Sequence, residues 1–178
     1  MSFRLGDFLL RSPEPDDVEL LYQQKNDPEI QQLLVGFSPG RSRQDIRDWI
    51  EYHRTRTDEV VWVVAEAESN RCVGHLGLYQ IDQRVRSADL GIMLGDKSVW
   101  GRGLGRACCR FALDFAFQHL NLNRIELRVL ASNERALGLY RSLGFQEEGR
   151  LRQAHYVNGR YLDVLVMSML RSECLGDG

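Results

Sequence analysis

Hydrophobic positions along the chain follow two spacings, one of about two residues, typical of strands, and one of about 3.6 residues, typical of helices. The residues from Val60 to Glu66 are rich in β-branched side chains and predict a strand. After a turn at Ser69-Asn70, the segments Cys72 to Ile81 and Ala88 to Leu94 predict two more strands. Together these strands indicate an antiparallel meander.

Two helices are expected before this meander, after a first strand over Phe8 to Arg11. The polar, proline-containing segment Ser12 to Asp17 ends the strand and caps a helix that extends to about Asn26. Pro28 ends this helix, because the residue before a proline avoids the α region. A loop follows, and apolar residues at helical spacing predict a second helix that begins at residue 42 or 43.

The second half of the chain alternates helices and strands. A long helix is predicted over Leu104 to Leu120, and a strand follows over Arg124 to Leu130. The next helix extends from Asn133, its N-cap, to Leu143, and Gly144 ends it. Two last strands, from Phe145 onward and over Tyr161 to Leu170, flank the hairpin turn Asn158-Gly159. The fold class is therefore α/β (α+β), with a central mixed, mostly antiparallel sheet of about seven strands flanked by about four helices. We expect one domain over residues 1–178, with a frayed tail at 173–178.

Composition narrows the classes of function. The net charge of −2 argues against a protein that coats nucleic acid. We see neither a signal peptide nor an apolar run long enough to span a bilayer, so we expect a cytoplasmic protein without a membrane partner. The four cysteines show no metal-ligand spacing, and we expect buried thiols and no metal site.

A glycine cluster from Trp100 to Arg106 separates a predicted strand from the long helix. Glycine permits positive φ and close approach of a ligand to the main chain, and the N–H groups at a helix N-terminus bind anions. The cluster is not a Walker loop, since no Gly-Lys-Ser/Thr follows, and Arg106 stands where a dinucleotide fingerprint needs its third glycine. A glycine-rich segment can be only a turn, but this one is a candidate site for the diphosphate of another cofactor.

Two segments resemble motifs of the GNAT superfamily of N-acetyltransferases. The segment Gly101 to Ala107 resembles the family's pyrophosphate loop, Gln/Arg-x-x-Gly-x-Gly/Ala, with Trp100 in place of the first residue. The segment Asn133 to Phe145 is similar to the family pattern Asn-x-x-Ala-x-x-x-Tyr-x-x-x-Gly-Phe. The resemblance covers residues 8–171 and is greatest to the branch of ribosomal-protein and spermidine N-acetyltransferases. It implies the GNAT fold, acetyl-CoA as co-substrate and direct attack of an amine on the thioester.

The resemblance also implies the residues of the site. The pantetheine arm would pair with the main chain of the fourth strand of this series, and the diphosphate would bind the glycine loop. The expected cofactor-binding residues are Ile92, Met93, Leu94, Gly101, Arg102, Gly103, Leu104, Gly105, Arg106, Asn133, Ala136 and Tyr140. By the same resemblance Tyr140 is the general acid that protonates the leaving thiolate, although its helical position alone predicts a core residue.

The acceptor amine must lose a proton before it attacks, because an alkylamine titrates near pH 10.4. A carboxylate can accept this proton. Asp89, at the start of the fourth strand, is the candidate base, and a solvated charge at a strand end is the alternative. His75 lies on the third strand beside the predicted site, whereas the other histidines carry no recognisable catalytic arrangement.

The acceptor is left open by the sequence, with a primary amine of a small molecule as the leading class. The loop between the first two helices contains Arg41, Arg43 and Arg47 against Asp45 alone, which disfavours a polycation, although Asp27 and Glu29 lie nearby. N-terminal protein acetylation, polyamine acetylation and a non-catalytic acyl-CoA-binding module are the alternatives. We expect no nucleic-acid partner, and a homodimer stays open.

Overall fold

The computed structural model describes residues 2–36 and 38–175 of the chain. Its strands are β1 (Ser2–Leu5), β2 (Phe8–Arg11), β3 (Val60–Glu66), β4 (Cys72–Asp82), β5 (Ser87–Leu94), β6 (Arg124–Leu130), β7 (Gln146–Val157) and β8 (Arg160–Leu170). Its helices are α1 (Val18–Lys25), α2 (Pro28–Gln31), α3 (Arg43–Thr55), α4 (Leu104–Asp114), α5 (Glu134–Leu143) and α6 (Arg171–Leu175). Short 3₁₀ turns cover Pro15–Asp17 and Lys97–Val99, and a π-helical turn covers Phe115–His119.

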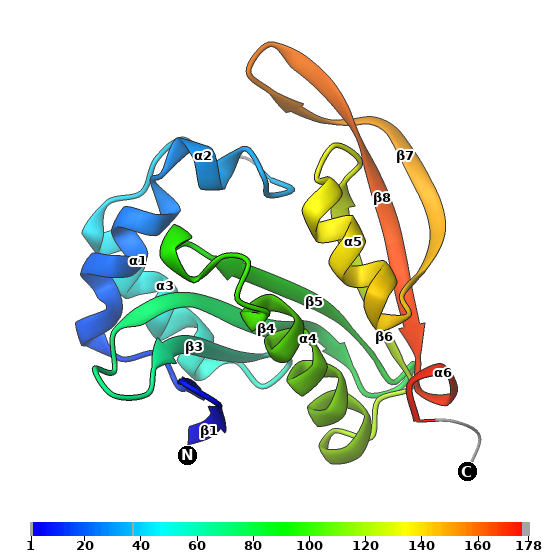
Figure 1. Ribbon diagram of the computed structural model, residues 1–178, viewed down its shortest axis with the longest axis horizontal. Helices are drawn as coiled ribbons and strands as arrows, with labels where there is room; N and C mark the ends of the chain where they lie inside the picture. Colours follow the sequence, from blue (N-terminus) through cyan, green and yellow to red (C-terminus); the bar gives the residue numbers. More distant parts are fainter. Residues whose placement is uncertain (1, 37, 176–178) are drawn as a thin grey trace.

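All eight strands form one open sheet in the order β1-β2-β3-β4-β5-β6-β8-β7 (Figure 1). Every neighbouring pair is antiparallel except β5 and β6, which run parallel. The predicted mixed, mostly antiparallel sheet is therefore confirmed, with one strand more than the seven expected. The additional strand is β1, a four-residue segment that pairs with β2 after a turn at Gly6, where φ is 62°.

Helices cover both faces of the sheet (Figure 1). Helices α1 and α3 pack on one face through Leu21 and Ile46, which contact Val63 of β3. Helix α4 packs on the other face, where the main core includes Trp62 and Val64 of the same strand. Because side chains of a strand alternate between faces, neighbouring residues of β3 belong to different cores. This alternation explains why the strand has no polar face.

The sheet divides between β5 and β6. Their parallel pairing covers only Ser87 to Asp89, opposite Arg124 to Glu126. Strand β6 instead pairs with β8 over its whole length, from Arg124 to Leu130. The residues of β5 beyond Asp89 thus keep β4 on one edge and have no partner from β6 on the other.

Three local expectations need correction. Pro28 ends α1 as predicted but also starts α2, since proline fits the first turn of a helix and the Asp27 side chain accepts hydrogen bonds from the main chain of Glu29 and Ile30. The predicted long helix changes to a π-helical turn at Phe115, where the N–H of Leu120 donates to the Phe115 carbonyl.

A short helix occupies part of the expected frayed tail. Residues 173–175 belong to α6. The Glu173 carboxylate accepts hydrogen bonds from the N–H of Leu170 at 2.8 Å and from the side chain of Gln146 at 2.6 Å. These contacts tie the helix to β7 and β8. The rest of the expected tail, 176–178, lies outside the described residues.

Candidate active site

A cavity of about 600 Å³ opens where β5 separates from β6. Its wall combines residues that are far apart in the sequence, from α1, α2 and the segment after it, β4, β5, β6, the glycine loop, the first turn of α4, and α5. Side chains from both faces of the sheet reach it: His75 and Met93 lie on the face covered by α1 and α3, and Leu104 belongs to α4 on the opposite face. A ligand in this cavity could therefore contact both faces.

The free edge of β5 forms one side of the cavity. Ile92, Met93 and Leu94, which the family resemblance implies as cofactor-binding residues, all line it. Because β6 does not pair with these residues, their outer main-chain groups are available to an extended ligand, which would bind as an added strand. The indole N–H of Trp100 donates to the carbonyl of Leu94 at 2.8 Å and closes the end of this edge.

The glycine loop forms the next side. Gly101 and Gly103 have φ values of 75° and 78°, in the left-handed region that favours glycine. Gly103 is the N-cap of α4, and the first helical hydrogen bond runs from the N–H of Ala107 to its carbonyl at 3.1 Å. The N–H groups of Leu104, Gly105 and Arg106 precede this bond, so they have no helical acceptor. This geometry fits a diphosphate.

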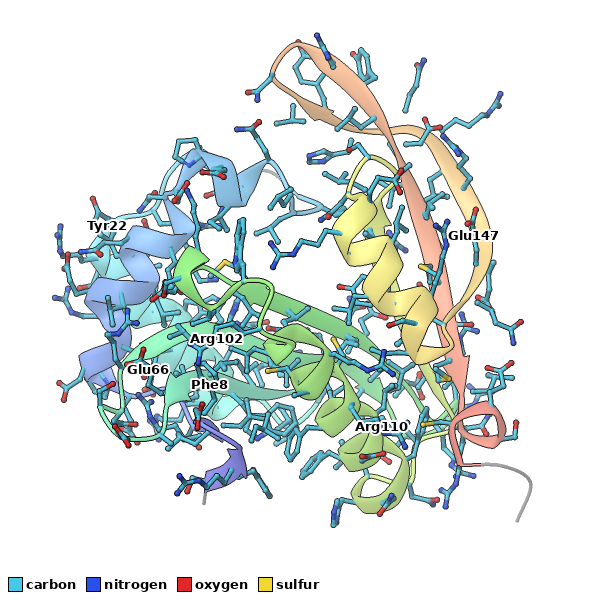
Figure 2. The ribbon with its side chains drawn as sticks, viewed as in Figure 1. Phe8, Tyr22, Glu66, Arg102, Arg110 and Glu147 are labelled. Atoms are coloured by element: carbon cyan, nitrogen blue, oxygen red, sulfur yellow. The ribbon has the colours of Figure 1, made fainter. Side chains whose placement is uncertain are left out.

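The arginines of the loop differ in position. Arg106 lines the cavity and donates to the Ser142 hydroxyl at 2.6 Å. Arg102 does not line it: its guanidinium lies over the Phe8 ring at 5.3 Å and 3.8 Å from Asp7 (Figure 2). Arg135, which sequence reasoning missed, does line the cavity.

Arg135 lies over the ring of Trp100, with 4.6 Å between the guanidinium carbon and the ring centroid. The sequence feature that could have indicated Arg135 as a site residue is its position two residues after Asn133, in the first turn of α5. Asn133 is the N-cap of α5, as predicted, and its Oδ1 accepts from the N–H of Ala136 at 3.1 Å. Its Nδ2 donates to the Leu33 carbonyl at 3.1 Å and so connects α5 to the segment after α2. Both Asn133 and Ala136 line the cavity.

Tyr140 projects from α5 into the same cavity wall and is only 8% exposed. Burial, with a smaller contribution from nearby Cys109, raises the pKa of its hydroxyl above the ordinary tyrosine value. The ring packs edge-on against Phe145 at 5.8 Å. The hydroxyl therefore keeps its proton at neutral pH, in a rigid position.

Asp89 is not brought to this wall. It lies where β5 still pairs with β6, opposite Glu126, and its carboxylate accepts a hydrogen bond from Gln80 at 3.0 Å. Burial, and then the charge of Glu126, raise the pKa of Asp89 above its ordinary value. A raised pKa suits a proton acceptor, but the carboxylate does not line the cavity.

Lys25 is a further cavity residue that sequence reasoning missed. Its ammonium lies 3.1 Å from Nε2 of His75 and 4.3 Å from the centroid of the Trp49 ring. Burial, and then the charge of Arg41, lower the pKa of Lys25 to about 8. Burial and the Lys25 charge hold the pKa of His75 well below its ordinary value, so the ring is neutral. Helical periodicity could have identified this residue, because Lys25 lies four residues after the buried Leu21 and therefore on the same face of α1.

Arg41 precedes α3, whereas Arg43 and Arg47 lie on it, and the three side chains have different surroundings. Arg41 lines the cavity. Arg43 instead pairs with Glu19 at 2.7 Å, and exposed Arg47 contacts Gln44 at 3.4 Å. Only Arg41 can thus act on a ligand in the cavity.

The charges on the cavity wall are of one sign. The lysine and arginine residues that line it are Lys25, Arg41, Arg106, Arg128 and Arg135. No aspartate or glutamate is among the described residues of this wall. In the part of the chain that the structure describes, no cluster of three or more potential ligands could hold a metal ion, and no helix is long and apolar enough to cross a membrane.

The sequence of this fold matches a family model described as an acetyltransferase (GNAT) domain over residues 7–146. The chain therefore belongs to the GNAT acetyltransferases. It is 32% identical over 166 residues to the spermidine N(1)-acetyltransferase of Vibrio cholerae, covering 93% of this chain and 94% of the relative. It is 35% identical over 104 residues to the putative ribosomal N-acetyltransferase YdaF of Bacillus subtilis, covering 58% of this chain and 56% of the relative.

A solved structure agrees with this assignment. The spermidine N-acetyltransferase from Vibrio cholerae, in complex with CoA and spermine, superposes with a TM-score of 0.87 at 31% identity. The match covers 95% of this chain and 98% of the other. The expected GNAT fold is confirmed, and the protein is an acetyl-CoA-dependent N-acetyltransferase.

Proposed function

We propose that this enzyme transfers the acetyl group directly to a primary amine of a small molecule, with Tyr140 as general acid. The observation that supports this is a single cavity lined by the free edge of β5, the N-terminus of α4 and Tyr140. These are the three elements that acetyl transfer from a coenzyme A thioester requires. They supply a binding edge for an extended arm, a site for the diphosphate and a proton for the sulfur.

The reaction follows from this arrangement. The edge of β5 would hold the thioester carbonyl, and a main-chain N–H there would polarise it. The neutral amine attacks the carbonyl carbon and gives a tetrahedral intermediate with a positively charged nitrogen. As the C–S bond breaks, Tyr140 donates its proton to the leaving thiolate, and the proton lost from the nitrogen of the intermediate returns to the tyrosinate, so protons balance. Asp89 is the proposed acceptor of the amine's proton, through water because its carboxylate does not line the cavity.

The Tyr140→Phe variant tests the acid. It keeps the ring against Phe145 and removes only the hydroxyl, so kcat should fall about 100-fold or more while affinity for acetyl-CoA is retained. Coenzyme A release measures kcat, and calorimetry measures affinity. Tyr52→Phe is the control, because Tyr52 is 52% exposed and does not line the cavity. A Tyr140→Phe enzyme with full kcat would exclude the hydroxyl from catalysis.

The relatives supply two rival acceptors. Spermidine is the substrate in the name of the Vibrio cholerae enzyme, which matches nearly the whole chain, and YdaF is named as a putative ribosomal N-acetyltransferase. A screen of polyamines, amino sugars and N-terminal peptides by coenzyme A release separates these classes. Release with none of them, despite binding of acetyl-CoA, would favour a non-catalytic acyl-CoA-binding module.

We also propose that the enzyme self-associates through the β7–β8 hairpin. A dodecameric structure of the spermidine N-acetyltransferase from Vibrio cholerae matches this chain with a TM-score of 0.81 at 30% identity. The hairpin extends away from the rest of the sheet (Figure 1), and it carries the exposed residues Leu151, Tyr156 and Tyr161. A second copy of the chain is the proposed partner of this surface.

A further inference from the structure

We infer that the acceptor amine carries a negatively charged group, a phosphate or a carboxylate, which binds at Lys25 and Arg41 on the α1 side of the cavity. This inference rests on the proposed acetyl transfer and names the class of its acceptor. It predicts that an anionic amine is preferred over a neutral amine and over a polyamine.

Four of the five cations of the cavity form two groups, and the fifth, Arg128 of β6, lies 3.9 Å from Glu126. Arg106 and Arg135 lie beside the first turns of α4 and α5, where Arg135 covers Trp100 and Arg106 binds Ser142. This group is next to the proposed diphosphate site, so the cofactor accounts for it. Lys25 and Arg41 come instead from α1 and the loop before α3, and Lys25 contacts His75 on the other face of the sheet. The cofactor phosphates do not explain this second group.

No carboxylate of the wall offsets Lys25 and Arg41. The acidic residues close to them in sequence are engaged elsewhere. Asp27 pairs with Lys97 at 3.0 Å, and Glu29 binds the same ammonium. Asp45 accepts a hydrogen bond from the N–H of Ser42 at 2.7 Å and does not line the cavity, although the charge of Arg41 contributes to lowering its pKa. A polyamine would therefore meet like charges here, without an acidic partner among the described residues of the wall.

The contacts of Lys25 leave donors unused. Its ammonium donates to Nε2 of the neutral His75, and its remaining contact is the face of the Trp49 ring. An ammonium has three N–H donors, so two are available to a ligand. Because Nε2 accepts, the imidazole proton is on Nδ1, which is buried and has no partner among the described residues. A cation buried without a carboxylate is costly unless a ligand supplies the opposite charge.

The same charges also favour the chemistry. A nearby positive charge disfavours the protonated form of an amine and lowers its pKa. The acceptor nitrogen would thus become neutral more readily beside Lys25 and Arg41, which helps a site whose candidate base Asp89 does not line the cavity. The anionic group of the substrate provides the binding energy that a polyamine would lack.

Matched amines test the inference directly. One set is 4-aminobutanoate, 4-amino-1-butanol and 1,4-diaminobutane, which differ in one terminal group, with spermidine as the longer cation. The second set is glucosamine 6-phosphate and glucosamine, so the two sets distinguish carboxylate from phosphate. We expect kcat/KM to be about 10-fold or more higher for the anionic member of at least one set, the size of a charge-assisted hydrogen bond.

Variants connect this preference to the two residues. Lys25→Met and Arg41→Ala should each lower kcat/KM for the anionic amine about 10-fold more than for the neutral amine, mainly through KM, because the neutral amine loses only the effect of the charge on its pKa. Arg43→Ala is the matched control, since Arg43 is in the same segment but pairs with Glu19 outside the cavity. Arg43→Ala should leave unchanged the ratio of kcat/KM for the anionic amine to kcat/KM for the neutral amine.

The outcomes separate this inference from the proposed function. If spermidine or 1,4-diaminobutane has the highest kcat/KM, acetyl transfer stands and the anionic acceptor is wrong. The inference is also wrong if an anionic amine is preferred but Lys25→Met and Arg41→Ala behave like Arg43→Ala. If the enzyme binds acetyl-CoA but releases no coenzyme A with any amine, both the transfer and the acceptor class fail.

Discussion

At the scale of single residues, Lys25 combines a cost to stability with a position in the site. The ammonium is largely buried, and burial lowers its pKa to about 8. Among the described residues, the charged and titratable groups that face it are Arg41, His75 and Cys72, none of which is a carboxylate. Natural proteins bury a charge without an oppositely charged partner mainly at functional sites.

This cost gives a prediction for stability. Because the folded state disfavours the charged form, Lys25 destabilises the protein below about pH 8, and this cost disappears as pH rises toward the unfolded pKa of about 10.4. Lys25→Met should raise the free energy of unfolding at pH 7 by about 1–3 kcal/mol, with a smaller gain at pH 10. Urea unfolding at the two pH values measures this.

Lys97→Met is the control for Lys25, because Lys97 is the second of the two lysines in the chain and is paired with Asp27 and Glu29 at the surface. It should produce no stabilisation at either pH. A loss of stability in Lys25→Met at pH 7 would show that the contacts with Trp49 and His75 outweigh the desolvation of the charge.

At the scale of elements, the start of α4 depends on glycine. The φ of 78° at Gly103 is strained for any residue with a Cβ, and more so for a β-branched one. A Cβ there would meet no atom within 4 Å, so the constraint comes from the backbone conformation.

Gly103→Val should therefore weaken acetyl-CoA binding at least 10-fold, because the altered loop redirects the N–H groups at the N-terminus of α4. Backbone strain of about 1–3 kcal/mol should accompany this loss. Calorimetry measures affinity, and thermal unfolding confirms that the variant is folded. Gly149→Val on β7 is the control, since its Cβ would also meet no atom within 4 Å and its φ is ordinary. Equal affinity in wild type and Gly103→Val would remove the loop from the cofactor site.

At the scale of the whole molecule, the division of the sheet between β5 and β6 creates the site, and the β7–β8 hairpin extends away from the rest of the sheet (Figure 1). The hairpin exposes Tyr156 and Tyr161 by 56% and 66%, and their rings are 4.9 Å apart. Exposed aromatic pairs of this kind are typical of protein interfaces.

A Tyr156→Ser/Tyr161→Ser double variant should shift the protein to a smaller assembly, measured by light scattering after gel filtration, without change in acetyl-CoA affinity. Tyr52→Ser, at the exposed surface of α3, should leave the assembly unchanged. A wild-type protein that is monomeric at all concentrations tested would contradict self-association through the hairpin.

Much of the fold was predictable from the sequence, because strand and helix periods, N-caps and glycine stops act within a few residues. The N-cap at Asn133 and the end of its helix at Gly144, where φ is 100°, are examples. The short strand β1 was missed, since four residues are too few to establish a period. Of the expected cofactor residues, the loop glycines and the edge of β5 line the cavity because main-chain geometry places them there.

The direction of long side chains was decided by tertiary structure alone. Arg102 turns toward Phe8 while Arg135 enters the cavity. The sequence places Arg135 in the first turn of its helix, near the site, but does not give the direction of either side chain. Lys25 meets His75 fifty positions later in the chain, and that contact exists only once α1 has packed on β4. The physical reason is that periods and caps depend on neighbours in sequence, whereas the charge of a cavity depends on which distant elements fold around it.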